Sequence, residues 1–276
     1  MPGVWLRAST VPTAPLGGIY EPAFALVAQG RKRTVLNDQV FEYGGGQYLV
    51  VSVDLPIVGQ VVRASEREPY LAVAMTLKPS VIAELLLEAP ARQKGTSEPT
   101  GLAVSVAPSE LLDPVERLLR LLDRRSDIPV LGPMLEREIA WRLLSGAQGA
   151  TVRAIGMADS RLSHVSRAIR WIRTHYAAPL RMEELADVAS MGASTFFRHF
   201  RAVTSMSPLQ YQKQVRLHEA RAQLIANAKD VAAVGFDVGY GSPSQFSREY
   251  SRMFGAPPGK DAELLRARSS AGRALP

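Results

Sequence analysis

The sequence contains no cysteine among its 276 residues. Disulfide bonds, thiolate metal sites and cysteine nucleophiles are therefore excluded, and with them enzymes that transfer alkyl groups from DNA to a cysteine. No apolar run approaches the length that a membrane span needs. The N-terminus also lacks the basic and then apolar segment of a secretory signal. These absences predict a soluble protein of the cytoplasm with no membrane partner.

Histidine is scarce and is confined to one half of the chain. The four histidines are His164, His175, His199 and His218, and residues 1–160 contain none. Catalytic metal sites draw mainly on histidine, cysteine and carboxylate ligands. We therefore expect no enzyme, no metal, no cofactor and no catalytic residue. His199 follows Arg198 and is predicted to be a polar surface or phosphate-contacting residue rather than a ligand.

Positive charge is concentrated in the C-terminal part of the chain. Of the 33 Lys+Arg and 26 Asp+Glu, 17 and 9 lie in residues 161–276, a net charge of +8. The remaining 16 and 17 give residues 1–160 a net charge of −1. A basic region joined to a neutral one favours a polyanionic partner for the first, although a merely solvated basic face would give the same count.

The basic region contains a stretch that is repeated at an offset of 50 residues. The segment TFFRHFRAVTSMSP (195–208) matches QFSREYSRMFGAPP (245–258), and ADVASMGAS (186–194) matches FDVGYGSPS (236–244). In both copies two aromatic residues lie four apart, Phe196 with Phe200 and Phe246 with Tyr250. Repetition at a fixed period fixes the architecture before any single residue is interpreted.

Each copy is predicted to form a helix-turn-helix. A short apolar-periodic segment ends in a glycine-containing turn, and a second periodic segment follows. Arg198 and Arg248 lie about 200° around that second helix from the preceding aromatic residue and so face outward. Ser242 is a suitable N-cap, with Pro243 in the first turn. Residues 207–227 contain no helix breaker after Pro208 and predict a long helix between the units, which would hold the recognition helices about one DNA turn apart.

The N-terminal half is predicted to be an antiparallel β-barrel or sandwich. Short segments rich in Val, Leu, Ala and aromatic residues recur at about ten-residue spacing from residue 22 to 107. A helix interrupts them at 80–89, and residues 91–101 are expected to form an exposed loop. Polar residues on these strands could line a pocket, but their alternation does not tell which face they occupy. They are Gln29, Tyr48, Ser52 and Tyr70.

Helical periodicity replaces the strand pattern after residue 108. Residues 108–125 carry an amphipathic stripe, and 129–146 form a second helix; these could pack on the barrel, connect the domains or form a dimer face. From 161 another helix places Val165, Ile169 and Ile172 inward and Arg167, Arg170 and Arg173 outward. The predicted order is a flexible leader (1–20), an effector or dimerisation barrel (21–107), linker or dimerisation helices (108–160), a DNA-binding domain (161–265, with its units at about 182–204 and 231–254) and a flexible tail (266–276).

These segments resemble the AraC/XylS-type bacterial transcription regulators. The strongest likeness is VGYGSPSQFSREYSRMFGAPP, close to the signature of that family's second helix-turn-helix. LVAQGRKRTVL, GGGQYLVVSVDLP and PYLAVAMTL resemble the cupin-like effector domain of one branch. The resemblance implies a two-domain α+β fold: a cupin-like β-barrel with flanking helices, then an all-α domain with two helix-turn-helix motifs joined by a long helix.

The resemblance also implies partners and contact residues. Partners would be double-stranded promoter DNA, a small-molecule effector, a second copy in a homodimer, and RNA polymerase if the protein is an activator. Arginine suits guanine, so base readout is favoured for Arg198, whereas for Arg248 it is balanced against the alternatives; for both, the alternative is a phosphate contact or a surface ion pair. Phe197 could meet a thymine methyl group or be core. The candidate DNA-binding residues are Ser194, Thr195, Phe197, Arg198, Arg201, Ser244, Gln245, Ser247 and Arg248.

Three positions depart from the family pattern, and two other functions remain open. Gly192 stands where the family has a capping serine, Ser190 where the turn often has glycine, and Gly235 where the first helix of the second unit usually has alanine. A cupin oxygenase or isomerase with a DNA-binding appendage would need the histidines that residues 1–160 lack. A non-specific architectural DNA binder would show no preference for a defined promoter.

Overall fold

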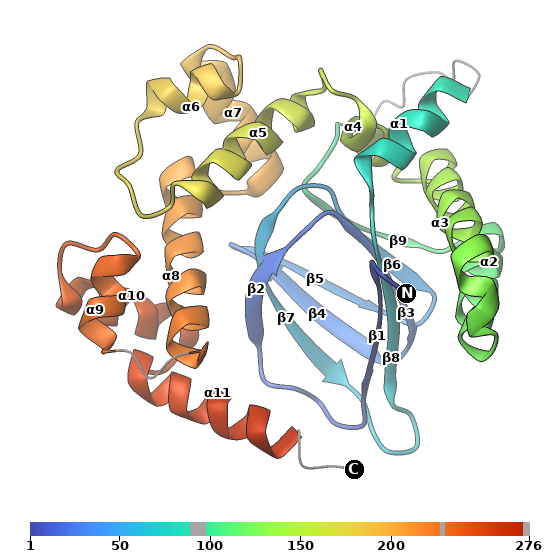
Figure 1. Cartoon of the computed structure of the whole chain (residues 1–276), viewed down its shortest axis with the longest axis horizontal. Coiled ribbons are helices and arrows are strands. Elements are labelled where there is room, and N and C mark those ends of the chain that lie inside the picture. The colour runs from blue at the N-terminus through green and yellow to red at the C-terminus, as the bar shows by residue number, and fades with distance from the viewer. Residues whose placement is uncertain (89–97, 227–229, 273–276) are drawn as a thin grey trace.

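The N-terminal half folds into two antiparallel sheets that face each other (Figure 1). The computed structural model describes residues 1–88, 98–226 and 230–272, with side chains as far as residue 267. One sheet has the strand order β1-β8-β3-β6-β9 and the other β2-β7-β4-β5. The strands are β1 Val4–Ser9, β2 Leu16–Tyr20, β3 Ala23–Gln29, β4 Arg31–Leu36, β5 Gln39–Gly44, β6 Gln47–Val51, β7 Leu55–Arg63, β8 Tyr70–Thr76 and β9 Leu102–Val106.

The five-stranded sheet buries apolar side chains on both of its faces. Leu49 and Val51 of β6 point between the sheets and join Leu55 and Ile57 of β7 in one cluster. Val50, one residue along β6, points the other way, toward the helices. Alternation along a strand produces this division because successive side chains leave opposite faces. The space between the sheets is therefore filled by side chains.

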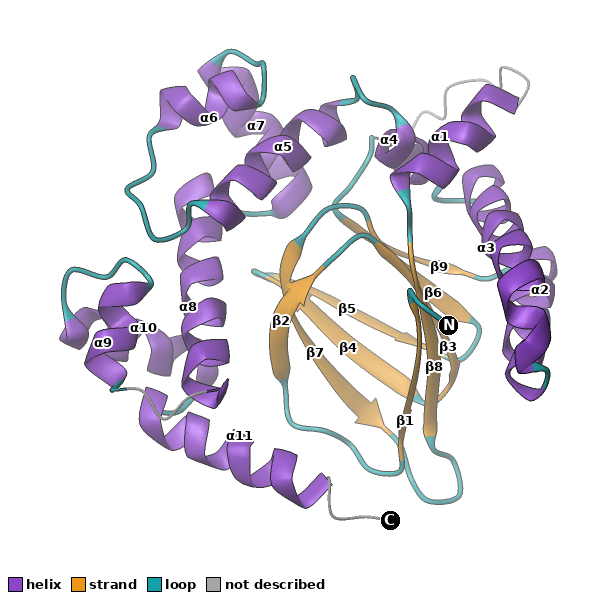
Figure 2. Cartoon of the chain, viewed as in Figure 1, coloured by secondary structure: helices purple, strands orange, loops and turns teal. Residues whose placement is uncertain are grey.

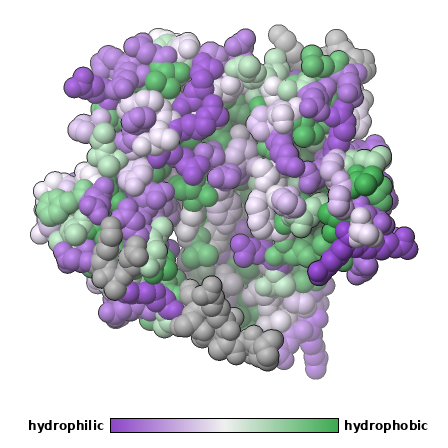
Figure 3. All heavy atoms as spheres, viewed as in Figure 1, coloured by the Kyte–Doolittle hydropathy of each residue, from purple (hydrophilic) through white to green (hydrophobic). Residues whose placement is uncertain are grey.

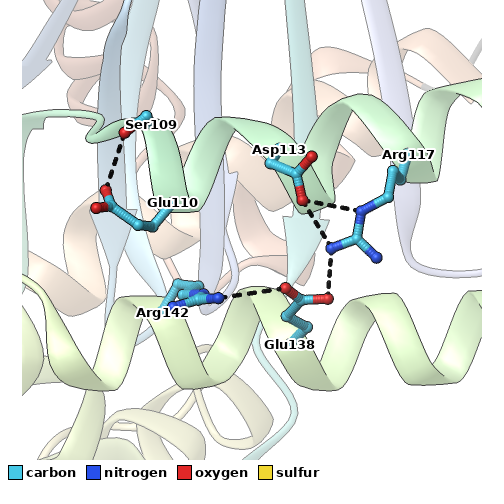
Figure 4. A network of polar contacts seen from close by, with 6 residues as sticks. All are labelled: Ser109, Glu110, Asp113, Arg117, Glu138 and Arg142. Carbon is cyan, nitrogen blue, oxygen red and sulfur yellow. Dashed lines mark hydrogen bonds and ion pairs between the residues drawn. The ribbon is translucent and has the colours of Figure 1, made fainter.

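Four helices cover the outer face of the five-stranded sheet (Figure 2). They are α1 Pro79–Glu88, α2 Ser109–Arg120, α3 Ile128–Ser145 and α4 Gly149–Gly156, and short 3₁₀ turns at Leu121–Asp123 and Arg125–Asp127 join α2 to α3. Arg117 links α2 to α3 because Nη2 contacts Glu138 at 2.6 Å and Asp113 at 2.9 Å (Figure 4). The expected helix over 80–89 is α1, although residues 89–97, most of the expected loop among them, lie outside the described residues.

The C-terminal half is entirely helical in the residues that the structure describes. Its helices are α5 Arg161–Thr174, α6 Met182–Val188, α7 Ala193–Thr204, α8 Pro208–Ala226, α9 Val231–Asp237, α10 Pro243–Phe254 and α11 Pro258–Gly272. The inward positions predicted for α5 are correct, since Val165, Ile169 and Ile172 are fully buried. The predicted two-domain α+β fold is confirmed.

Two segments expected to be flexible are regular structure. Residues 1–20 contribute β1, which pairs with β8, and β2, which pairs with β7. The Pro and Gly content of this leader hid the strands because β pairing depends on partners far along the chain. At the other end, the expected tail from residue 266 continues α11 as far as Gly272. Residues 273–276 lie outside the described residues.

The two halves share one hydrophobic core. Val51, Leu55 and Ile57 of the barrel belong to the same cluster as Ile169 of α5 and Phe200 of α7. The helix α8 lies beside β2 and β7 (Figure 1). A Cβ on Gly17 of β2 would lie 2.8 Å from Cε1 of His218, so strand and helix are in close contact. The barrel is therefore packed directly against the helix that joins the two helix-turn-helix units.

Candidate DNA-binding surface

The first helix-turn-helix consists of α6 and α7. Phe196 and Phe200 of α7 are fully buried, and the Phe200 ring meets Tyr211 of α8 edge-on at 5.7 Å between centroids. Ser190 turns the chain between the helices with φ +52°, a left-handed conformation that glycine adopts without strain. A serine is strained in this conformation, and the hydrogen bond that its Oγ accepts from Arg167 Nη2 at 3.3 Å partly offsets that strain. The buried aromatic pair fixes which face of α7 points outward.

The second helix-turn-helix consists of α9 and α10. Phe246 and Tyr250 are fully buried in the positions of Phe196 and Phe200, so the predicted equivalence at an offset of 50 is correct for the recognition helices. Gly239 turns the chain with φ +91°, and a Cβ there would lie 2.2 Å from the carbonyl oxygen of Ala177. Only glycine fits this position.

The first helices of the two units are offset by 49 residues, not 50. In the turns, Ser190 N donates to Asp187 O, and Gly239 N donates to Phe236 O. Ala189 and Val238 are the matching buried residues. The identities of Asp187 with Asp237 and Val188 with Val238 are therefore not structural equivalents. The second unit contains one more residue in its turn, which restores the offset of 50 before α10.

Gly235 has a packing reason that the sequence did not reveal. A Cβ on Gly235 would lie 3.0 Å from Cδ1 of Phe246, so the helices α9 and α10 approach each other closely at this point. Gly192 and Ser242 occupy the N-cap positions of α7 and α10, but neither makes a side-chain capping hydrogen bond. The prediction of Ser242 as N-cap is therefore correct in position and wrong in mechanism.

Arg216 of α8 connects the two units and was missed by the sequence analysis. Its Nη1 donates to Gly239 O at 2.8 Å, in the turn of the second unit. Its Nε donates to Tyr176 O at 2.6 Å, and Nη2 to Ala178 O at 3.0 Å, in the segment that leads into the first unit. Gln212, one turn earlier, also donates to the carbonyl oxygens of Tyr176 and Ala178. Since all the acceptors are main-chain carbonyls, no pairing pattern marks this residue in the sequence.

A second set of polar contacts attaches α10 and α11 to α8. The guanidinium of Arg221 binds both carboxylate oxygens of Asp261, at 2.8 and 2.9 Å. Tyr250 OH donates to the same carboxylate at 2.8 Å. The Arg221 guanidinium also lies 4.3 Å from the centre of the Phe254 ring. Burial is the main cause that raises the pKa of Tyr250 above its usual range, so its hydroxyl remains a donor.

The candidate contact residues lie on the outer faces of the recognition helices. Ser194, Arg198 and Arg201 of α7 and Ser244, Gln245 and Arg248 of α10 are exposed, while Thr195 and Ser247 are half-buried. Phe197 is 38% exposed and, with Arg198 and Arg201, lines a hollow of about 590 Å³ beside α7. Within the described parts of the chain, none of the three arginines forms an ion pair with a carboxylate. Their guanidinium groups are therefore available to an external acceptor.

The residue that follows the exposed arginine differs between the two recognition helices. Burial, followed by the charges of Arg161 and Arg198, lowers the pKa of His199, whose ring is therefore neutral and only half-exposed. Glu249 of α10 occupies the matching position. Although burial opposes its ionisation, hydrogen bonds from Lys213 and Tyr240 hold the pKa of Glu249 below its usual value. At this position the first recognition helix therefore carries a neutral ring where the second carries a carboxylate.

Other predicted positions have different surroundings from those expected. Arg173 does not simply face solvent, because its Nη1 is ion-paired with Asp54 in the loop after β6. The polar residues considered for a barrel pocket do not converge. Tyr48 faces the covering helices, whereas Tyr70 belongs to the cluster between the sheets, where burial raises its pKa to about 12. Ser52 Oγ donates to Thr100 O, and Gln29 Nε2 donates to Pro69 O.

Two observations concern membranes and metals. In the part of the chain that the structure describes, no helix combines the length and apolar character of a membrane span. Over the same residues, no three His, Asp or Glu side chains gather as metal ligands would. His164 instead contacts Ala189 O through Nδ1 at 2.6 Å, and His175 stacks on Trp171 with ring centres 4.4 Å apart.

Two helix-turn-helix units on one long helix, each with an exposed arginine on its second helix, define a DNA-binding protein. A family model described as the AraC-type transcriptional regulator N-terminus matches residues 1–151, and one described as a helix-turn-helix domain matches residues 185–263. The chain belongs to the AraC-type transcriptional regulators. The resemblance drawn from the sequence is confirmed.

Curated relatives that match about half of the chain are transcription regulators. The chain is 28% identical over 160 residues to the HTH-type transcriptional activator RhaS of Escherichia fergusonii, covering 55% of this chain and 56% of RhaS. It is 24% identical over 156 residues to the HTH-type transcriptional regulator ArgR of Pseudomonas aeruginosa, and the match covers 56% of this chain and 47% of ArgR. The chain therefore spans about half the length of the curated relatives it matches.

Solved structures of ToxT from Vibrio cholerae share the fold over nearly the whole chain. An apo form of a ToxT point variant superposes with a TM-score of 0.60 at 6% identity, covering 96% of this chain and 98% of that one. ToxT bound to (E)-4-(8-methylnaphthalen-1-yl)but-3-enoic acid superposes with a TM-score of 0.61 at 8% identity. That match covers 95% of this chain and 99% of the ToxT chain. At such low identity the likeness supports the arrangement of both halves and no residue-level role.

Proposed function

We propose that this protein is a sequence-specific regulator of transcription that reads two successive major grooves with α7 and α10. The observation that carries the proposal is that Arg198 and Arg248 are exposed on two recognition helices joined by α8, and that neither is ion-paired with a carboxylate of the described residues. Nineteen residues of α8 at ~1.5 Å per residue span about 28 Å, which is close to the roughly 34 Å between successive major grooves on one face of a duplex.

Selection from random duplexes, followed by footprinting, tests this function. We expect an enriched sequence with two protected segments about 10 base pairs apart on one face of the duplex. Binding of equal strength to all duplexes, with no enrichment, would instead identify a non-specific architectural protein. The proposal includes no enzymatic step. It places the protein in the cytoplasm, and it includes contact with RNA polymerase if the regulator activates transcription.

We further infer that a small molecule controls the DNA-binding half. Two of the solved ToxT structures hold an unsaturated fatty acid and a naphthalenyl butenoic acid, which supports a sensing role for a chain of the same fold. The close packing of β2 against α8 would let a change in the barrel alter the relation between the two recognition helices. The test is whether a small molecule changes the operator affinity of the full chain.

A homodimer through α2 and α3 forms the remaining part of the proposal. Val130, Leu131 and Met134 are 67%, 40% and 62% exposed on this side of the molecule, where hydrophobic side chains gather at the surface (Figure 3). Leu131 and Met134 also line a hollow of about 790 Å³ between the two helices. Exposed apolar clusters of this kind favour an interface between proteins.

Sedimentation of matched variants tests the dimer. Met134→Glu should shift the protein to a monomer, while Leu87→Glu on α1, where the native side chain is 89% exposed, should leave its mass unchanged. A monomeric wild type, or a dimer unaffected by Met134→Glu, would contradict this interface.

A further inference from the structure

A cavity of about 510 Å³ lies between the barrel and the first helix of the DNA-binding half. Its volume is within the roughly 300–1,000 Å³ that is typical of small-molecule sites. The barrel contributes the segments after β2, β6 and β8, and the helices α1, α4 and α5 close the other sides. By contrast, the space between the two sheets is filled by buried side chains such as Leu36, Leu49 and Ile57.

Arg170 of α5 is the cationic side chain in the wall of this cavity. Its guanidinium makes one long side-chain contact, 3.5 Å from Nη1 to Ser166 Oγ. It forms no ion pair with any residue that the structure describes. The planar guanidinium fork matches a carboxylate in two-point geometry, and because Arg170 is exposed its donors can be reached by a ligand. Arg170 is therefore suited to anchor an anion that enters the cavity.

The rest of the wall limits the ligand to one negative charge and an apolar body. Glu21 and Asp54 also line the cavity, and Arg173 contacts both, at 3.9 Å in the case of Glu21. Their negative charges would repel a second anionic group. Leu77, Ile155 and Leu162 supply apolar surface. These features fit a monocarboxylic acid with a hydrocarbon or aromatic body.

We propose that this cavity is the effector site, and that its ligand is an apolar monocarboxylate held by Arg170. The inference rests on the proposed function, because it assigns a place and a chemistry to the effector. A ligand in the cavity touches the barrel and α5 together. The buried face of α5 packs in one cluster with Phe196 and Phe200 of α7. Occupancy is therefore coupled to the position of the first recognition helix.

Calorimetric titration of the full chain with four eight-carbon probes tests the ligand class. We expect octanoate to bind saturably, with octanamide and octylamine weaker by about tenfold or more because each lacks the charge that Arg170 attracts. Suberate, with a second carboxylate, should also be weaker. Equal binding of octanoate and octanamide, or no saturable binding of octanoate below about 1 mM, would overturn the proposal.

Two pairs of variants locate the site. Arg170→Gln should weaken octanoate about tenfold or more, whereas Arg67→Gln removes the same charge from the exposed turn before β8 and should have no effect. Ala83→Phe should block the cavity from within α1, whereas Leu87→Phe lies on the same helix outside it. Circular dichroism would verify that each variant is folded. Wild-type affinity in either cavity variant would overturn the assignment.

The coupling has its own measurement, which separates this inference from the proposed function. Saturating octanoate should change operator affinity by about fivefold or more, and operator DNA must change octanoate affinity by the same factor. Octanoate binding that depends on Arg170 but leaves operator affinity unchanged would refute the coupling. Failure to enrich any operator would refute the proposed function, while Arg170-dependent octanoate binding would still support the ligand site.

Discussion

Asp54 and Arg173 join the barrel to the DNA-binding half by an ion pair, and Asp54 also accepts a hydrogen bond from Tyr211 OH at 2.8 Å through its main-chain carbonyl. Asp54 lies in the loop between β6 and β7, Arg173 near the end of α5 and Tyr211 in α8. Three segments from both halves therefore meet at one residue. Although burial opposes the charge of Arg173, the hydrogen bond to Asp54 raises its pKa.

Removing this ion pair should loosen the junction between the halves. We expect Asp54→Ala and Arg173→Ala to be coupled by about 1–2 kcal/mol in a double-mutant cycle, a value reduced from that of a fully buried pair because Arg173 is 32% exposed. Urea unfolding of the four proteins measures the coupling. Additive effects of the two substitutions would show that the pair contributes nothing to the junction.

Arginine substitutions on the recognition helices should distinguish base contacts from phosphate contacts. If Arg198 reads a base, Arg198→Ala should weaken operator binding by about 1–3 kcal/mol and binding to random DNA far less. The same comparison applies to Arg248→Ala. Arg67→Ala, in the exposed turn before β8, removes an equal charge far from the recognition helices and serves as the control. Equal losses on operator and random DNA would make the arginine a phosphate contact.

Gly239 and Gly241 provide a matched pair for the turn of the second unit. Gly239→Ala should destabilise the protein by about 2–3 kcal/mol or more, because φ is +91° and the added Cβ would meet Ala177 O at 2.2 Å. No heavy atom lies within 4 Å of the corresponding position at Gly241, so Gly241→Ala should be nearly neutral. Thermal unfolding compares the two. Similar melting temperatures would contradict the described turn.

His218 should make stability depend on pH between about 4 and 6.5. Burial, followed by the charge of Arg221, lowers the pKa of His218 to about 4, and its Nε2 is buried without a hydrogen-bond partner among the described residues. Well above about pH 6.5 the ring is neutral in both the folded and the unfolded state, so its titration does not change the free energy of unfolding. As the pH falls, the unfolded chain takes up a proton first and stability decreases, by about 3 kcal/mol at pH 4.

The variant His218→Phe isolates this contribution. It keeps an aromatic ring against Phe254 and removes the titrating group. Urea unfolding at pH 7.5 and pH 4.5 should therefore show a smaller loss of stability in the variant than in the wild type. An equal loss in both proteins would assign the acid sensitivity to other groups.

The sequence predicted the parts of the fold that depend on local periodicity. The apolar faces of α5, α7 and α10 follow from helical spacing, and the length of α8 follows from the lack of a helix breaker after Pro208. The strands of residues 1–20 were missed because β1 gains its stability from β8, more than 60 residues away. The extra turn residue of the second unit was hidden by chance identities of Asp187 and Val188 with residues 50 positions later.

Long-range polar contacts could not be read from the sequence. Arg216 binds carbonyl groups and Asp54 binds an arginine 119 residues away, and neither type of contact leaves a spacing pattern. The exposure of Arg198 and Arg248 was predicted, because the buried aromatic residues fix the outer face of each helix. Which atoms of DNA they contact stays a prediction.

The connections of Arg216 have a consequence for promoters. Arg216 binds both the segment before the first unit and the turn of the second unit. The two recognition helices are therefore held in a fixed orientation relative to each other, and so they face the duplex at a fixed angle around its axis. Inserting about five base pairs between the half-sites would move one of them to the opposite side of the double helix. We therefore expect the base sequence of the spacer between half-sites to vary among binding sites, while its length stays constant.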